Sequence, residues 1–169
     1  PEENKIVFTE DGFLHTGDLG SIDEMGRLKV TGRAKELFKT SKGEYVAPAP
    51  IENLLSNHPL VEACYVTGSG YHQPHSVVML CEEVRQISSE ADRQSIETKL
   101  SVLLDEVNAS LASYEHLAFI AITNDVWNAE NGFLTPTLKI KRQVLLATYG
   151  PLAEKWYEMQ QPVVWQATV

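Results

Sequence analysis

The stretch Gly32–Pro48 separates two kinds of sequence, and this change most constrains how the chain folds. Before it, short apolar runs alternate with turn signals, which predicts a meander of about three short strands over residues 6–31. After it, helix-spaced and strand-like runs alternate, which predicts a small α/β or α+β domain. A short meander is marginally stable by itself in water. We therefore expect residues 1–33 to be the end of another domain.

The second part predicts the order extended segment, helix, two strands, helix, strand, loop and helix. The apolar spacing of Ile51, Leu54 and Leu55 indicates a helix that Pro50 opens. We expect Gly150-Pro151 to break or restart the last helix, and the tail after Pro162 to be mobile. The other expected elements are strands at 61–67, 76–81 and 117–122, a long helix over about 92–111, a loop at 125–132, a basic extended segment at 134–142 and a helix at 144–159.

Composition narrows the class of function. The net charge of −9 and the pI near 5.0 argue against a general nucleic-acid binder, which needs a basic face. Cys64 and Cys81 lie in apolar runs, so we expect free, buried thiols and a reducing, cytoplasmic location. No apolar run approaches the ~18 residues of a membrane span. The chain does not begin with Met, so we expect a fragment of a longer protein.

Three short motifs carry groups that could bind a nucleotide. Asp18, after Thr16-Gly17, could present two acceptor oxygens to a diol such as a ribose. Arg33 and Lys35 could reach phosphate or ribose oxygens, and Gly43 would allow close approach of the backbone to a ligand. Taken singly, each of these motifs is more often a turn or a solvated charge.

A fourth motif contains Lys139, Lys141 and Arg142. In an extended segment the two lysines share one face, where a cation could stabilise negative charge on a carboxylate or phosphate. A charged edge strand is an equally good interpretation. The histidines show no metal-ligand spacing, and we expect no metal site; His72 and His75 are expected to be surface residues.

The order and spacing of these motifs are more specific than any one of them. Together they resemble the C-terminal portion of the adenylate-forming (acyl-CoA synthetase, AMP-binding) superfamily, and most closely its long-chain fatty acid–CoA ligase branch. The resemblance covers nearly the whole chain and rests on Asp11–Asp18, Gly32–Lys39, Lys42-Gly43, Val46–Pro48, Ile51-Glu52 and Leu134–Arg142.

This resemblance implies an α+β fold: a small, mobile C-terminal domain with a short mixed sheet and flanking helices, preceded by the last β-strands of a larger N-terminal domain. Residues 1–33 would be the terminal meander of the large AMP-binding domain. Residues 34–43 would be the hinge, and residues 44–169 the small C-terminal domain.

The resemblance also implies roles for single residues. Asp18 would hold the ribose hydroxyls of ATP, and Arg33 would contact the same nucleotide. Lys35 would be the hinge residue about which the small domain rotates. Lys139 would bridge the acyl carboxylate and the α-phosphate during adenylation, with Lys141 as the alternative. Gly43 would line the coenzyme A path in the second half-reaction.

The implied reaction uses ATP, a fatty acid and coenzyme A as co-substrate, with Mg²⁺ bound by a ligand in the N-terminal domain that this chain lacks. We therefore expect the chain alone to be inactive and its own N-terminal domain to be its main partner. The resemblance implies no transmembrane segment and is compatible with peripheral membrane association of the full-length enzyme. Acyl chain length and oligomeric state stay open.

Two departures from the family pattern and two alternatives stay open. The family often has Gly-Gly-x-Asn after the hinge, where this chain has Lys42–Tyr45, and Gly-Lys where this chain has Leu138-Lys139.

The first alternative is a fatty acyl-AMP ligase that loads a carrier protein instead of coenzyme A. The second is a non-catalytic α/β interaction domain.

Overall fold

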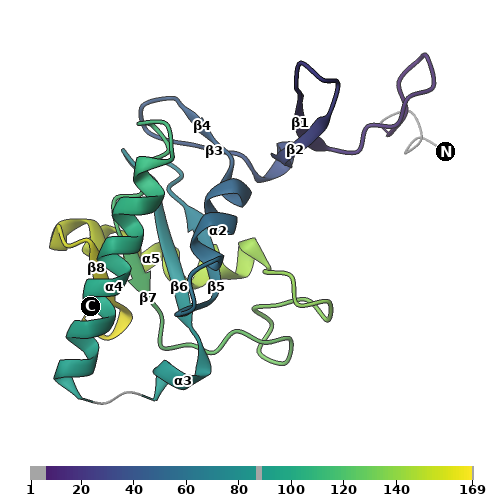
Figure 1. Cartoon of the computed structure of the whole chain (residues 1–169). Helices are drawn as coiled ribbons and strands as arrows, with labels where there is room; N and C mark the ends of the chain where they lie inside the picture. Colours follow the sequence, from purple (N-terminus) through teal and green to yellow (C-terminus); the bar gives the residue numbers. More distant parts are fainter. Residues whose placement is uncertain (1–6, 87–88, 169) are drawn as a thin grey trace.

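The computed structural model describes residues 7–86 and 89–168. Two β-hairpins come first, and a layered domain follows (Figure 1). The first hairpin pairs β1 (Asp18–Ile22) with β2 (Leu28–Arg33), and the second pairs β3 (Phe38–Lys39) with β4 (Tyr45–Val46). The other elements are η1 (Ala34–Glu36), α2 (Pro48–Ser56), β5 (Val61–Thr67), β6 (His75–Leu80), α3 (Glu82–Arg85), α4 (Glu90–Ala109), β7 (Ile120–Ile122), α5 (Arg142–Met159), β8 (Val163–Trp165) and η2 (Gln166–Thr168).

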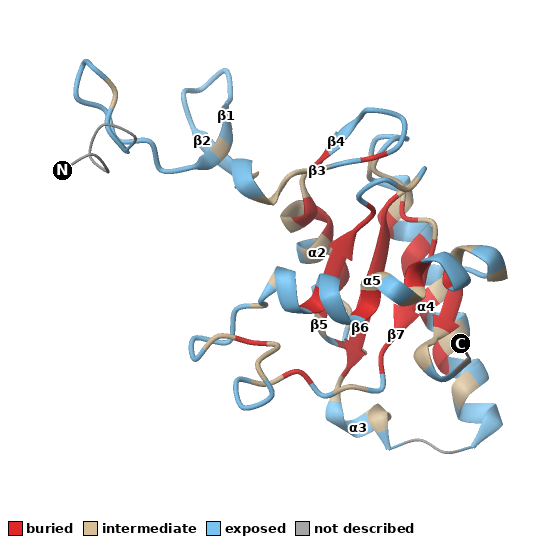
Figure 2. Ribbon diagram, turned by 180° about the vertical axis from the view of Figure 1, so that it is seen from behind, coloured by how far each residue is buried: buried red, intermediate tan, exposed pale blue. Residues whose placement is uncertain are grey.

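A four-stranded mixed sheet organises the small domain, by which we mean β3 to β8 with their helices. Its strand order is β5-β6-β7-β8; β5 and β6 are antiparallel, and β6, β7 and β8 run parallel. Helices α2 and α4 cover one face and α5 covers the other (Figures 1 and 2). The predicted α+β fold with a short mixed sheet is confirmed.

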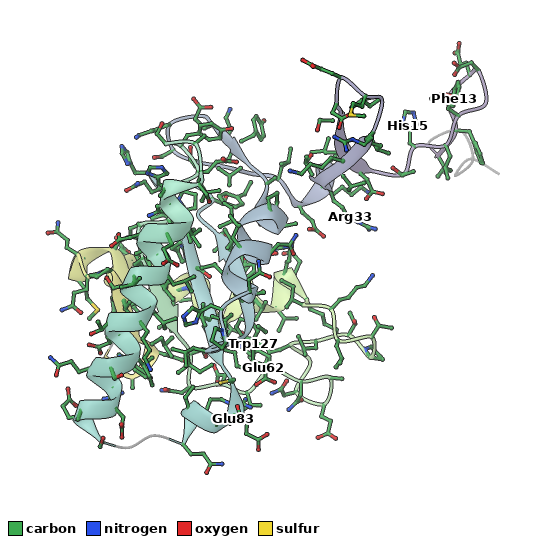
Figure 3. The ribbon with its side chains drawn as sticks, in the orientation of Figure 1. Phe13, His15, Arg33, Glu62, Glu83 and Trp127 are labelled. Atoms are coloured by element: carbon green, nitrogen blue, oxygen red, sulfur yellow. The ribbon has the colours of Figure 1, made fainter. Side chains whose placement is uncertain are left out.

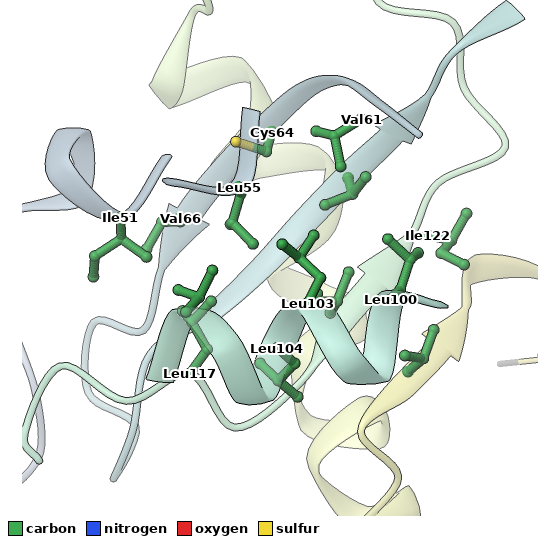
Figure 4. Close-up of a cluster of buried hydrophobic side chains, with 14 of the residues drawn as sticks. Ile51, Leu55, Val61, Cys64, Val66, Leu100, Leu103, Leu104, Leu117 and Ile122 are labelled. Carbon is green, nitrogen blue, oxygen red and sulfur yellow. The ribbon is translucent and has the colours of Figure 1, made fainter. Parts of the chain in front are cut away.

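Strand alternation divides the buried side chains between the two faces, because successive side chains of a strand point to opposite sides. On β6, Val78 and Leu80 join the cluster under α2 and α4, whereas Val77 and Met79 join the cluster under α5. All six β6 residues are buried, as expected of a strand covered on both faces. Figure 4 shows the first cluster, to which Leu100, Leu103 and Leu104 of α4 contribute.

The N-terminal hairpin (β1–β2, residues 18–33) lies apart from this core and exposes its apolar side chains (Figure 2). Ile22, Leu28 and Val30 are 72%, 68% and 62% exposed. A turn at Asp23–Gly26 joins its two strands. Residues 13–16, which lie within the predicted meander, form no strand, and Phe8 and Leu14 form a single bridge. Ile6, predicted to start the first strand, lies outside the described residues.

Two expectations about proline are wrong. Helix α2 begins at Pro48, so Ala49 is helical although Pro50 follows it. Both prolines fall in the first turn, where the missing N–H has no helical acceptor to lose. Helix α5 also continues through Pro151. Gly150 precedes this proline without a side chain, and the burial of Tyr149, Ala153 and Trp156 outweighs the lost bond.

The end of the chain is also more ordered than expected. Residues 163–165 form β8, which pairs in parallel with β7, and Val163 and Val164 are buried on opposite faces of the sheet. The predicted strand at 117–122 is shorter, since only Ile120–Ile122 pairs. Cys64 and Cys81 are free thiols, as expected, although Cys81 is only partly buried. No helix in the described part of the chain is long and apolar enough to cross a membrane.

His75 is not a surface residue, contrary to the sequence-based expectation. It is 2% exposed and stacks on Phe119 with 5.0 Å between ring centroids. Tyr157 donates its hydroxyl proton to the Gln73 carbonyl, so the 3.1 Å contact between His75 Nδ1 and the Tyr157 oxygen makes Nδ1 the protonated nitrogen of a neutral ring. Burial lowers the pKa of His75 to about 3.

This buried imidazole predicts a pH dependence of stability. A histidine in the unfolded chain titrates near ~6.5. Between that value and the lowered folded pKa, only the unfolded state takes up the proton, so stability falls as the pH is lowered. Between pH 6.5 and 5, the wild-type chain should lose about 2 kcal/mol of its free energy of unfolding through this histidine, and His75→Gln should lack that loss. Urea unfolding at the two pH values measures the difference. The exposed His72→Gln is the control and should keep the wild-type slope. Equal slopes in all three proteins would contradict the assignment.

Candidate functional site

Asp18 and Arg33 come together at the base of the N-terminal hairpin. They are opposite each other in the β1–β2 register, and Arg33 Nε lies 3.2 Å from Asp18 Oδ1. The Asp18 backbone N–H bonds to the Thr16 hydroxyl, and Gly17 has φ +75°, which a residue without a side chain adopts freely. The turn is therefore built without the Asp18 carboxylate, which is left to face Arg33.

These two residues line an open cleft of about 770 Å³ between the hairpin and the small domain. Glu36 and Asn53 add polar groups to it, and Ala49, Pro50 and Leu54 add apolar ones. The cleft thus offers a carboxylate and a guanidinium at one edge, groups that suit a diol and a phosphate respectively. Figure 3 shows Arg33 near the junction, with Phe13 and His15 farther out on the projecting segment.

Lys35 lies in the middle of η1, a three-residue 3₁₀ helix that connects the N-terminal hairpin to the small domain. Its side chain is exposed, and no residue of η1 is buried. The Ala34 N–H bonds to the Gly17 carbonyl on the hairpin side, at 2.9 Å. Such a short, uncovered connection is the kind of segment that absorbs a change of backbone angles between two bodies.

Gly43 lies in the turn between β3 and β4. Its φ is +91°, and its N–H bonds to the Thr40 carbonyl at 3.0 Å. The hairpin is anchored to the small domain, because Thr40 is buried and the Ser41 N–H bonds to the Tyr71 carbonyl at 2.9 Å. The exposed Gly43 backbone is thus held on a fixed support.

Lys139 and Lys141 lie in residues 134–141, here called the lysine loop. The predicted extended segment is wrong, because the chain reverses within it: Leu134 bridges Ile140, and the Thr135 N–H bonds to the Lys139 carbonyl at 2.8 Å. The Thr135 side chain, which also accepts from the Lys139 N–H at 3.1 Å, closes the turn. Both lysine side chains are exposed, and among the described residues neither forms an ion pair.

Leu138 forms the tip of this loop in the left-handed conformation, with φ +61°, and is 73% exposed. A residue with a side chain loses about 1–2 kcal/mol there, which glycine avoids. The conformation persists because the Leu138 N–H bonds to the Thr135 carbonyl at 2.9 Å. This left-handed position accounts for the glycine that the family often has where this chain has Leu138. Strain of this kind concentrates at functional sites.

The lysine loop and the β3–β4 hairpin lie on different sides of the small domain. In Figure 1 the hairpin lies at the top, whereas the green segment after β7 that carries the loop lies at the lower right; Figure 2 agrees from behind. Lys139 is also absent from the residues that line the cleft with Asp18 and Arg33. The structure therefore brings Asp18 and Arg33 together but keeps Gly43 and Lys139 apart.

Sequence analysis missed one charged cluster beside these residues. Arg142, directly after the lysine loop, binds Glu52 and Glu36. Glu52, the one charged residue of the mainly apolar helix 48–56, is the signal that could have revealed a buried partner. No group of three or more metal-ligating side chains occurs among the described residues.

Comparisons with known proteins agree on one family. Residues 36–161 match the model of the AMP-binding enzyme C-terminal domain. Long-chain-fatty-acid–CoA ligase 6 of Homo sapiens is 33% identical over 174 residues, which cover 94% of this chain and 25% of the relative. Long chain acyl-CoA synthetase 7, peroxisomal, of Arabidopsis thaliana is 30% identical over 171 residues, covering 92% of this chain and 24% of the relative. The chain thus spans about a quarter of the length of these relatives.

Solved structures of adenylating enzymes have the same fold. The A domain of carboxylic acid reductase from Segniliparus rugosus, in complex with AMP and a co-purified carboxylic acid, has a TM-score of 0.75 and 31% identity, covering 94% of this chain and 25% of that one. The A-PCP didomain of that enzyme, in complex with AMP, has a TM-score of 0.74 and 31% identity, covering 93% and 22%.

Proposed function

Because this chain belongs to the AMP-binding enzyme C-terminal domain family, we propose that it is the C-terminal part of an ATP-dependent acyl-CoA synthetase that activates a long-chain fatty acid. The observation that carries this proposal is the placement of Lys139 and Gly43 on different sides of one small domain, beyond a short exposed connection. Residues 1–33 are then the last strands of a large N-terminal domain. The hinge lies within 34–43, with its pivot at Lys35, and the β3–β4 hairpin turns together with residues 44–169 as part of the small domain.

In the first half-reaction a carboxylate oxygen of the fatty acid attacks the α-phosphorus of ATP, and pyrophosphate leaves. Negative charge gathers on the carboxylate and α-phosphate oxygens, so an ammonium held between them lowers the barrier. Lys139, on its hydrogen-bonded loop, supplies this cation. Asp18 accepts hydrogen bonds from the ribose hydroxyls and Arg33 contacts the same nucleotide, which their pairing beside the cleft supports.

In the second half-reaction the thiol sulfur of coenzyme A attacks the acyl carbonyl carbon, and AMP leaves. The coenzyme must then approach where Lys139 lay. Rotation of the small domain about Lys35 withdraws the lysine loop and presents the β3–β4 hairpin with the exposed backbone of Gly43. One orientation cannot present both sides of the domain to the same site, so two half-reactions require two orientations.

The exposed apolar side chains of the N-terminal hairpin support a partner domain for this chain. Ile22, Leu28 and Val30 are more than half exposed. Apolar side chains of a strand are exposed in this way when the sheet that would cover them belongs to another domain. We place the Mg²⁺ ligand in that domain and expect the present chain alone to form no acyl-CoA. The two unpaired cysteines support a cytoplasmic location.

The hinge assignment is tested by Lys35→Pro in the full-length enzyme. Proline fixes φ near −65° and so stiffens the pivot. We expect acyl-adenylate formation within about threefold of wild type and thioester formation slowed at least about tenfold. The two half-reactions are followed separately, by pyrophosphate release and by transfer from preformed acyl-AMP.

The matched control is Lys35→Ala, which removes the same charge but leaves φ free. It should keep both half-reactions near wild type. If Lys35→Ala slows thioester formation as much as the proline variant does, the ammonium and not the backbone freedom is what matters, and the pivot must be placed elsewhere.

A fatty acyl-AMP ligase that transfers to a carrier protein is the second candidate, which the similarity to an A-PCP didomain favours. The full-length enzyme decides between them when it is given preformed acyl-AMP with either coenzyme A or a carrier protein that bears pantetheine. Our proposal requires transfer to free coenzyme A.

A further inference from the structure

Arg142 joins two carboxylates from distant parts of the chain. Its terminal nitrogens donate to the two oxygens of Glu52 at 2.8 and 2.6 Å, and its Nε lies 3.2 Å from Glu36 Oε2. Glu52 also accepts the Val66 backbone N–H at 2.8 Å, which connects the cluster to β5. The guanidinium lies over the ring of Tyr65, 5.9 Å from its centroid. A two-pronged contact of this kind sets orientation as well as distance.

The cluster is shielded from water more than ordinary surface pairs are. The side chains of Arg142 and Glu52 are 21% and 13% exposed, and that of Glu36 is 34% exposed. Burial by itself would lower the pKa of Arg142, but the hydrogen bonds and charge of Glu52 and the charge of Glu36 raise it overall. The guanidinium is therefore charged, and the contacts are ion pairs that solvent screens only in part.

The three residues lie on three separate segments of the chain. Glu36 is the last residue of η1 and directly follows Lys35. Arg142 is the first residue of α5 and directly follows the lysine loop. Glu52 lies on α2, whose Ile51 and Leu55 are fully buried in the core.

We propose that Glu36, Arg142 and Glu52 form a rigid link, so that the lysine loop follows each rotation of the backbone at Lys35. This inference rests on the proposed function. Glu36 and Arg142 are positioning residues, because they act through the placement of Lys139. Among the described residues 34–37, Glu36 makes the one ion pair with the small domain. Without it, the backbone alone carries the orientation set at Lys35 as far as Phe38, which pairs with the buried Val46 and packs against the core.

The test compares Glu36→Gln with the matched control Glu62→Gln. Glu62 pairs with Arg85 at 3.0 Å, with side-chain exposures of 45% and 17%, so both variants neutralise a half-exposed glutamate beside a mostly buried arginine. In the full-length enzyme we expect Glu36→Gln to lower kcat of acyl-adenylate formation roughly tenfold at unchanged KM for ATP, because misplacement costs rate rather than binding. Glu62→Gln should stay within about twofold, and Glu36→Asp should regain part of the lost rate.

Hydrogen exchange on the present chain tests the link without any activity. Glu36→Gln should speed exchange of the amides of residues 36–39 several-fold, whereas Glu62→Gln should not. Equal kinetics and equal exchange in the two variants would overturn the link. If the wild-type enzyme forms no acyl-adenylate, the proposed function fails, while the exchange experiment still decides whether Glu36 rigidifies the connection.

Discussion

Lys139→Ala in the full-length enzyme is expected to slow acyl-adenylate formation by about a hundred- to a thousandfold, the usual cost of removing one group that stabilises transition-state charge. Thioester formation from preformed acyl-AMP should stay near wild type, because in that step the lysine loop is turned away. Pyrophosphate release measures the first reaction, and acyl-CoA formation from added acyl-AMP measures the second. A loss confined to the first reaction is the signature of a group used in only one orientation.

Lys141→Ala is the matched control, since it removes the same charge from the same loop two residues away. Lys139 lies in the turn itself, next to its tip at Leu138, whereas Lys141 already caps α5, where its N–H bonds to the Phe133 carbonyl. We therefore expect Lys141→Ala to retain most of the adenylation rate. If the two variants exchange effects, the roles of the lysines must be exchanged as well. Near-normal adenylation in both would leave the interpretation as a non-catalytic interaction domain.

Arg142→Leu is expected to lower the free energy of unfolding of this chain by about 3–5 kcal/mol, because it leaves the carboxylate of Glu52 buried without its counter-charge. Urea unfolding of the 169-residue chain measures it. Arg85→Leu is the control: its partner Glu62 is 45% exposed and stays hydrated, so the loss should be about 1 kcal/mol. Similar losses in the two variants would show that Glu52 is not effectively buried.

The double variant Glu52→Leu with Arg142→Leu separates the ion pair from the other roles of each side chain. It removes both charges together, so it should lose about 1–3 kcal/mol less than the sum of the two single variants. Recovery should be incomplete, since the Val66 N–H loses its acceptor in any chain without Glu52. Strictly additive losses would mean that Glu52 and Arg142 do not interact measurably.

Local pattern predicted most elements but failed where packing outweighed a local preference. Periodicity located the helix at 90–109 and the strands at 61–67 and 75–80 within one or two residues. It failed at Pro151 and at residues 163–165, because burial of Trp156 and pairing with β7 are non-local effects. His75 was misjudged for a similar reason: its Gln-Pro neighbours indicate a loop, but the side chain enters an aromatic cluster.

Residue types at set spacings were enough to predict the family and the small mixed α/β domain, and to single out Asp18, Arg33, Lys35, Gly43 and Lys139 as candidate site residues. Which of these residues lie close together depends on how the chain packs. Packing pairs Asp18 with Arg33 and reverses the chain within the lysine loop that carries Lys139. It places Gly43 on another side of the small domain. It also joins Glu36 to Arg142 through a contact that no spacing along the chain encodes. Contacts between residues far apart in sequence arise only when helices and strands pack, so their chemistry becomes visible only in the folded chain.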